Sequence, residues 1–307
     1  MKYNIENKLV IAVASSALFD LTHADKVFRE QGEKEYRIYQ REHEDEMLEK
    51  GVAFPLIKRL LSIDPEERPV EVILLSRNDP DTGLRVFKSI EHYRLPIIRA
   101  VFVAGSNPFP YMDSFNAALF LSGNPEDVKE AVKHGFPAGC IYPTNYIDDE
   151  DDQELRIAFD FDGIIADDSA ETIFKQGALE AFNTHEKELA GSPLPPGPLS
   201  RFFKEISNLQ KRELAKHRKD NNYKPRIRIA IATARNAPAH ERVITTLRRL
   251  DIMVDEAFFL GGIDKYSVLR VFKPHIFFDD QVGHIEGVAS QFPSVHVPFG
   301  IANTRKK

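Results

Sequence analysis

Two pairs of aspartates follow short apolar runs in the second half of this 307-residue chain. Asp160 and Asp162 come directly after the run RIAF, and Asp279 and Asp280 directly after HIFF. Carboxylate oxygens are the ligands that Mg²⁺ prefers, and two or three from different strands suffice because this ion keeps several waters. The sequence therefore predicts a magnesium site made of Asp160, Asp279, Asp280 and the main-chain carbonyl of Asp162.

A hydroxyl and an ammonium group accompany these carboxylates. Thr233 ends the apolar run RIAIAT, and Lys265 lies just beyond the run EAFFLG. Such groups beside a metal ion can orient a phosphoryl group and neutralise its charge. Gly163 would let the backbone turn sharply next to that group. Each residue alone could be a helix cap, a strand residue or a surface cation, but their ordered occurrence predicts phosphoryl chemistry.

The elements that precede these residues must bring them together. The predicted strands of the second half cover residues 156–159, 228–233, 256–261 and 275–278, and the predicted helical segments between them cover 169–182, 201–219 and 240–250. Short β-branched or aromatic strands separated by crossovers predict an α/β fold with a parallel sheet and helices on both faces. In such a sheet functional residues gather at the carboxyl edge, where all of the predicted site residues should meet.

The order DFDG, IATAR, GGIDK and FFDD resembles the haloacid dehalogenase superfamily of aspartate-nucleophile phosphatases. The phrases AVASSALFD, YRIYQREHE, LLSRND, GPLSRFF, DEAFFLGG and KPHIFFDDQ are similar, more narrowly, to the cytosolic 5′-nucleotidase I family, over nearly the whole chain. The resemblance implies a Rossmann-like haloacid dehalogenase fold. It also implies Mg²⁺-dependent hydrolysis of AMP and related nucleoside monophosphates.

The expected reaction divides slow phosphate-ester hydrolysis into two steps. Asp160 would attack phosphorus in line to form an aspartyl-phosphate, while Lys265 offsets the repulsion between carboxylate and phosphate. Asp162 can protonate the leaving O5′ and then deprotonate the attacking water. Thr233 would donate to a phosphoryl oxygen, and Gly163 and Arg235 are candidate substrate contacts.

The two halves of the chain repeat one pattern. Placing Ser76 on Thr233 sets an offset of 157 residues that holds without a gap as far as Asn124 on Gln281, with Arg85 on Arg242 among the few identities. Upstream, offsets of 142 to 146 bring KVFREQG onto TIFKQG. We interpret this as two copies of one unit, predicted at 1–147 and 148–307, with a helical insertion in the second at about 170–224. Chance similarity between two α/β segments is the alternative.

The first copy lacks the catalytic residue types. Ala14 and Ser16 stand where the second copy has Asp160 and Asp162; the other replacements are Ser76 for Thr233, Pro108 for Lys265, and Ser122 and Gly123 for the second aspartate pair. This copy should be catalytically silent. Its polar residues Ser16, Arg77 and Asn78 lie at the phosphate-binding positions. It is therefore expected to line the nucleoside pocket, to hold an effector nucleotide, or to serve only as structural support.

Composition sets limits on location and partners. The net charge of −6 argues against a protein that mainly coats nucleic acid or an anionic membrane. Cys140 is the sole cysteine, which excludes an intrachain disulfide. No apolar run approaches the ~20 residues that cross a bilayer. We expect a cytoplasmic protein that acts on a nucleoside monophosphate, without nucleic-acid or membrane partners and with homo-oligomerisation open.

Other functions are compatible with part of this pattern. The motifs specify phosphoryl chemistry and not the leaving group, so a phosphatase for another phosphorylated metabolite is an alternative. A phosphorylatable receiver module also combines Asp, Thr and Lys, but its accepting Asp lies on a middle strand and lacks the Asp two residues later. A non-catalytic nucleotide-binding regulator would have lost the carboxylates from both halves, whereas the second half keeps them.

Overall fold

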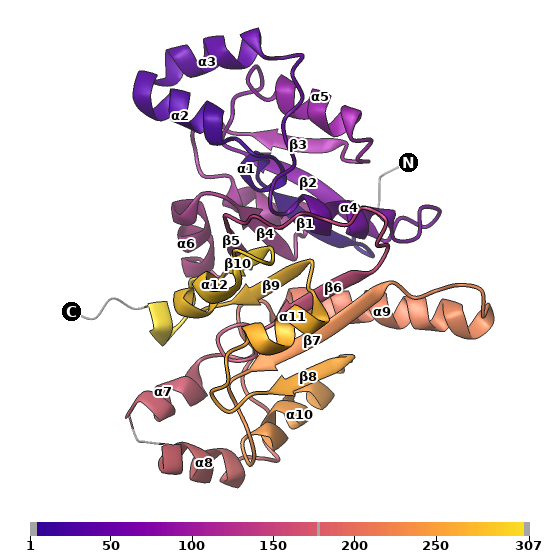
Figure 1. Cartoon of the computed structure of the whole chain (residues 1–307), viewed down its shortest axis with the longest axis vertical. Coiled ribbons are helices and arrows are strands. Elements are labelled where there is room, and N and C mark those ends of the chain that lie inside the picture. Colours follow the sequence, from indigo (N-terminus) through magenta and orange to yellow (C-terminus); the bar gives the residue numbers. More distant parts are fainter. Residues whose placement is uncertain (1–4, 177–178, 304–307) are drawn as a thin grey trace. The chain divides into compact units, whose positions relative to one another are not determined.

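The computed structural model describes residues 5–176 and 179–303 and is shown in Figure 1. The chain divides into two compact units, the first ending at Phe136 and the second beginning at Pro137. Each unit combines helices with mostly parallel strands. Among the described residues, no helix is both long enough and apolar enough to span a membrane.

The strands of the first unit lie in the order β3-β2-β1-β4, and the pairs within it are parallel. They are β1 (Leu9–Val13), β2 (Val70–Ser76), β3 (Arg99–Phe102) and β4 (Leu119–Ser122). The helices are α1 (Ser15–Leu18), α2 (Thr22–Gln31), α3 (Glu33–Glu42), α4 (Phe54–Ser62), α5 (Leu84–His92), η1 (Phe109–Phe115) and α6 (Pro125–Lys133). Every residue of β1, β2 and β4 is buried, which explains their continuous apolar sequences.

The strands of the second unit lie in the order β5-β10-β9-β6-β7-β8, and β5 alone among these described strands is antiparallel to its neighbour. They are β5 (Ala138–Tyr142), β6 (Leu155–Phe159), β7 (Ile227–Thr233), β8 (Glu256–Phe259), β9 (Ile276–Asp279) and β10 (Ser294–His296). The helices are α7 (Ser169–Gln176), α8 (Leu179–Glu188), α9 (Ser200–Lys219), α10 (His240–Arg249), α11 (Tyr266–Phe272), α12 (Val282–Val288) and η2 (Ile301–Asn303).

Successive residues of a strand point to opposite faces of the sheet. Because the strands of the second unit carry apolar side chains on both faces, helices cover both. Ala158 of β6 belongs to a buried cluster with Leu269 of α11. The next residue, Phe159, packs edge-to-face on Phe203 of α9, with ring centroids 4.6 Å apart, and stacks on Phe278 of β9 at 5.1 Å. This packing fixes β6 and β9 side by side, so the residues that follow them are held close together.

The four strands predicted for the second half are confirmed as β6 to β9, and the predicted helical segments 201–219 and 240–250 as α9 and α10. The segment 169–182 forms parts of two helices, α7 and α8. Two short strands, β5 and β10, were not predicted. β5 pairs with β10 and belongs to the second compact unit, which begins at Pro137, whereas the division predicted from the sequence lies at residue 148.

The two units share one order of strands. The order β3-β2-β1-β4 in the first corresponds to β8-β7-β6-β9 in the second. The strands β2, β3 and β4 begin at residues 70, 99 and 119, and β7, β8 and β9 begin 157 residues later, at 227, 256 and 276. The first strands, β1 and β6, begin 146 residues apart, at 9 and 155. Both spacings are those of the sequence repeat.

The helices α7 and α8 follow β6 and begin the predicted insertion. In the second unit they lie on the side of the strands toward which the arrowheads of β7 and β8 point (Figure 1). Since strand arrowheads mark the carboxyl ends, this helical pair lies at the edge where the candidate site residues are found.

Candidate active site

The predicted site residues of the second unit converge at the carboxyl ends of three neighbouring strands. Asp160 follows β6 directly, Thr233 is the last residue of β7 and Asp279 is the last residue of β9. Since β9, β6 and β7 are adjacent and parallel, their ends meet at one edge. Lys265 comes from the loop after β8, immediately before α11. The structure therefore brings these four side chains together as the sequence predicted.

The ammonium of Lys265 bridges two buried carboxylates. Its Nζ lies 2.8 Å from Asp160 Oδ2 and donates to Asp279 Oδ2 at 2.6 Å. Burial lowers the pKa of Lys265, but the two carboxylates raise it by more, so the pKa lies above its ordinary value and the side chain stays charged. A fixed cation thus faces Asp160, where it can attract an incoming phosphoryl group.

The two carboxylates differ in pKa because they have different neighbours. Burial and the neighbouring Asp279 raise the pKa of Asp160 to about 7, against the lowering effect of Lys265. Burial also raises the pKa of Asp279, but Lys265 and His284 lower it by more, and the net pKa lies below its ordinary value. The N–H of Gln281 donates to Asp279 Oδ1 at 2.8 Å, in keeping with this difference. Asp160 is the carboxyl that a further cation would most assist.

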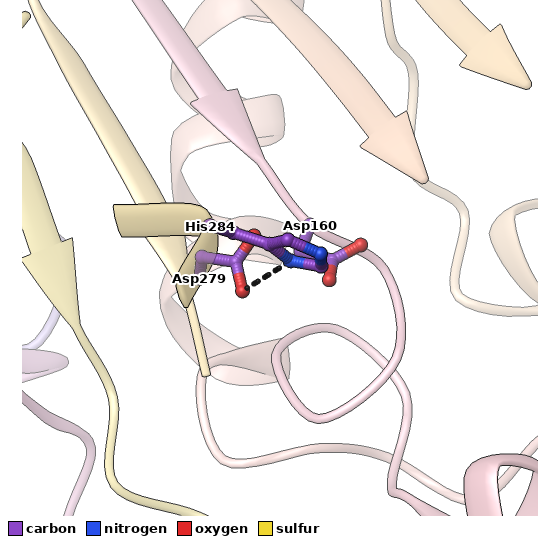
Figure 2. A group of neighbouring side chains, drawn as sticks. All are labelled: Asp160, Asp279 and His284. Carbon is purple, nitrogen blue, oxygen red and sulfur yellow. Dashed lines mark hydrogen bonds and ion pairs between the residues drawn. The ribbon is translucent and has the colours of Figure 1, made fainter. Parts of the chain in front are cut away.

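His284 of α12 was not anticipated from the sequence. Its Nδ1 lies 3.1 Å from Asp279 Oδ2 and 3.3 Å from Oδ1. Figure 2 shows the imidazole beside both Asp279 and Asp160, and one ligand atom from each of the three lies within 4.8 Å of the others. The spacing Asp279-x₄-His284, which starts at a strand end and enters a helix, could have indicated it.

Asp280 lies against the loop that follows β6. Gly163 has φ +72°, and a Cβ atom built on it would lie 2.6 Å from the carboxyl carbon of Asp280. Glycine is therefore required twice over, for the left-handed backbone and for the close approach. Asp280 is 1% exposed and directly follows Asp279, the last residue of β9.

The charges of this cluster suit a bound divalent cation. The buried carboxylates of Asp160 and Asp279 share one buried ammonium, that of Lys265, which leaves one negative charge in excess when all three are ionised. Buried charge is costly unless it is paired. Oxygen donors with a net negative charge fit Mg²⁺, and the expected donors are Asp160, the carbonyl of Asp162, and Asp279 and Asp280, each of these last two directly or through water.

Thr233 and Asp162 face the same edge. The hydroxyl of Thr233 accepts from the N–H of Arg235 at 3.2 Å, and its own hydrogen can be donated to a phosphoryl oxygen. Asp162 is partly exposed, and both of its carboxylate oxygens accept from the guanidinium of Arg235, each at 2.7 Å.

Arg235, a candidate substrate contact, is held by two carboxylates. Besides Asp162, it forms a buried ion pair with Glu186 of α8. Glu186 also accepts from Arg242 of α10 at 2.7 Å. Neither Glu186 nor Arg242 was predicted as a functional residue. The identity of Arg85 and Arg242 across the repeat was the available signal.

The polar residues of the first unit also lie at the strand ends, but bond to one another. Arg77 donates to Asp127 from Nε at 2.7 Å and to the carbonyl of Gly105 from Nη1 at 2.8 Å. The hydroxyl of Ser16 accepts from the N–H of Gly123 at 3.2 Å. Asn78 accepts from the hydroxyl of Tyr36 at 3.2 Å. A nucleotide site at these residues stays a prediction, in which a bound anion would compete with Asp127 for Arg77.

Comparison with known proteins agrees with the resemblance drawn from the motifs. A family model described as 5′-nucleotidase matches residues 1–304. Human cytosolic 5′-nucleotidase 1B is 33% identical over 291 residues, which cover 92% of this chain and 47% of that protein. The chain thus spans about half the length of this curated relative.

Proposed function

Because the chain belongs to the 5′-nucleotidase family, we propose that it hydrolyses nucleoside 5′-monophosphates such as AMP to a nucleoside and inorganic phosphate. The supporting observation is the convergence of Asp160, Lys265 and Asp279 at one strand edge, with Asp280 packed against the loop after β6. The second unit is proposed to be a catalytic domain of the haloacid dehalogenase type.

Asp160 is the proposed nucleophile. One of its carboxylate oxygens attacks phosphorus as the bond from phosphorus to O5′ breaks, which gives an aspartyl-phosphate and a nucleoside. Lys265, already bonded to Asp160, pairs with the negative charge of the phosphoryl group, and the hydroxyl of Thr233 donates to one of its oxygens.

Asp162 is the proposed proton carrier. It gives a proton to the leaving O5′ in the first step and takes one from water in the second. That water attacks phosphorus, the bond to Asp160 breaks, and inorganic phosphate leaves. The partly exposed position of Asp162, two residues after the nucleophile, suits a group that must reach both the leaving oxygen and water.

Mg²⁺ is proposed as the cofactor, held by Asp160 and the carbonyl of Asp162, with Asp279 and Asp280 each contributing directly or through water. When bound, it would offset the excess negative charge of the site and of the phosphoryl group. The fit rests on the buried oxygen donors and their net charge, as derived above.

The first unit is proposed to be a degenerate copy of the second. Both have the same strand order, and β2, β3 and β4 begin at the same intervals as β7, β8 and β9, yet Ala14 and Ser16 replace the nucleophile and the proton carrier. All chemistry is therefore assigned to the second unit. Effector binding, lining of the nucleoside pocket, self-association and a cytoplasmic location stay predictions from the sequence.

The test is phosphate release from a panel of nucleoside monophosphates and sugar phosphates, measured with Mg²⁺ and then with a chelator. We expect release from nucleoside monophosphates that chelation abolishes and added Mg²⁺ restores. Preference for a sugar phosphate would support a phosphatase of another metabolite. Absence of hydrolysis of any of them would refute the proposal.

A further inference from the structure

A buried ionic network connects the helical insertion to Asp162. Arg235 binds both oxygens of Asp162, and its third nitrogen, Nη1, pairs with Glu186. The second oxygen of Glu186 accepts from Arg242, which also donates to the carbonyl of Ser192 at 2.9 Å. Glu186 is completely buried, and Arg235 is 4% exposed. Every nitrogen of the Arg235 guanidinium is thus directed at a carboxylate.

The geometry restrains Asp162 without occupying it fully. A carboxylate can accept about four hydrogen bonds, and the fork of Arg235 takes one position on each oxygen. The plane of the carboxylate is thereby set, while further positions can face a leaving oxygen or a water. A long arginine side chain needs an anchor to keep this orientation, and Glu186 of α8 provides one.

The first unit shows that the architecture does not require these charges. By the offset of 157 residues, Asn78 and Arg85 take the places of Arg235 and Arg242. There the hydroxyl of Tyr36 donates to Asn78, Gln40 donates to Tyr36 at 3.0 Å, and Arg85 donates to Gln40 at 3.3 Å. A mostly neutral chain of hydrogen bonds thus connects the helix α3 to the end of β2.

The comparison separates support from chemistry. In the first unit α3 is hydrogen-bonded to the end of β2, and in the second unit α8 is bonded to the end of β7. The buried carboxylate–arginine–carboxylate arrangement occurs in the second unit, which has Asp160 and Asp162. Desolvating such charges can cost more than their attraction returns, so stability alone is weak reason for them. A need to hold the carboxylate of Asp162 in one orientation would explain why these buried charges are present.

We propose that Arg235 and Glu186 are positioning residues. Arg235 orients the carboxyl of Asp162 for proton transfer, and Glu186 of the insertion fixes Arg235. This inference rests on the proposed function, because it takes Asp162 as the proton carrier. The insertion therefore contributes to the chemical step through Glu186.

The test exploits the leaving group. Cleavage of AMP requires protonation of a poor leaving oxygen, whereas p-nitrophenyl phosphate releases a stable phenolate that needs no proton. Single-turnover release of nucleoside or p-nitrophenol isolates the first step from hydrolysis of the aspartyl-phosphate. For Glu186→Gln and Arg235→Lys, we expect the AMP rate to fall roughly 10- to 100-fold and the p-nitrophenyl phosphate rate by less than about threefold.

Control variants define the scale. Asp162→Asn should show the largest difference between the two substrates. Glu205→Gln, which removes a surface partner of Arg201 in the same insertion, and Gln40→Ala, which breaks the neutral chain of the first unit, should leave both rates unchanged. Should Glu186→Gln fail to fold, Glu186→Asp keeps the buried charge and still displaces the anchor.

The outcomes separate the two proposals. Equal losses for both substrates, or no loss for either, would overturn the positioning role while leaving the nucleotidase proposal intact. Wild-type protein that cleaves neither AMP nor any other nucleoside monophosphate would overturn the nucleotidase proposal, and the inference with it.

Discussion

At the scale of single residues, one cation is shared by two carboxylates that differ in the number of their other hydrogen-bond partners. Lys265 lies between Asp160 and Asp279, but Asp279 is also supported by Gln281 and His284. Asp160 therefore keeps the higher pKa, about 7, and gains most from a further positive charge. This difference agrees with the proposal that Asp160 is the nucleophile.

Replacing the nucleophile should abolish turnover. Asp160→Asn removes the attacking oxygen anion, and an amide binds Mg²⁺ poorly. We expect phosphate release to fall by on the order of 10⁴-fold or more. The measurement is steady-state phosphate release, with circular dichroism to show that the variant is folded. Appreciable hydrolysis by the purified variant would rule out the covalent route through Asp160.

Gly163 should be needed for metal affinity. In Gly163→Ala the new Cβ would meet the carboxyl of Asp280 at 2.6 Å, so that side chain must move. We expect the apparent affinity for Mg²⁺ to fall roughly 10-fold or more, as for other displaced metal supports. Isothermal titration with Mg²⁺ measures this. Gly191→Ala is the matched control, because a Cβ there has no atom within 4 Å, and an equal loss in both variants would contradict the argument.

At the scale of elements, the sequence predicted what local periodicity determines. The strands that carry Asp160, Thr233 and Asp279 are short, buried and apolar, and each was predicted from that pattern. β10 has three residues, and β5 pairs with it from a distant part of the chain, so neither has a local signature. Glu186 was missed because tertiary packing brings this helix residue to Arg235 without a local motif, whereas for His284 the signal was its spacing from Asp279.

The anchoring of α8 should depend on pH. Burial raises the pKa of Glu186, but Arg235 and Arg242 lower it by more, so the pKa lies below its ordinary value of 4.5. A carboxyl with a lowered folded-state pKa stabilises the fold above its unfolded pKa, and this stabilisation is lost as the pH falls through the folded value. The difference in unfolding free energy between wild type and Glu186→Gln should therefore be constant near neutrality and shrink below about pH 4.5.

Urea unfolding over a series of pH values measures this difference. Glu205 is the control, because burial raises its pKa against the lowering effect of Arg201. Because ionisation of a carboxyl with a raised folded-state pKa weakens the fold, the difference in unfolding free energy between wild type and Glu205→Gln should rise, and not shrink, as the pH falls. A pH-independent difference for Glu186→Gln would show that folding leaves the pKa of Glu186 unchanged, and a difference that rises as the pH falls would show that this pKa is raised in the folded state.

At the scale of the whole molecule, the two units share one strand order, and the candidate catalytic residues lie in the second. The first unit has a connection from helix α3 to the end of β2, and it has Ala14 and Ser16 where the second has aspartates. The shared strand order agrees with the repeat proposed from the sequence, because hydrophobic periodicity persists when individual residues change. The bonding of the first unit's polar residues could not be predicted, since it depends on which side chains become neighbours.

Arg77 tests what the first unit does. Its guanidinium bonds to Asp127, whose side chain is 3% exposed, and to the carbonyl of Gly105. We expect Arg77→Ala to cost about 1–2 kcal/mol of unfolding free energy, because a buried acceptor loses its donor while the exposed part of the pair contributes little.

Steady-state kinetics of Arg77→Ala should show unchanged kcat and KM, because the candidate catalytic groups belong to the second unit. The response to added ADP or ATP should also be unchanged if Arg77 has a structural role. Asp127→Asn is the matched variant, since it removes the same ion pair from the other side. A response that is unchanged in both variants would give Arg77 a structural role, whereas a response altered in Arg77→Ala but kept in Asp127→Asn would support the effector site predicted from the sequence, because it would show that the arginine itself binds phosphate.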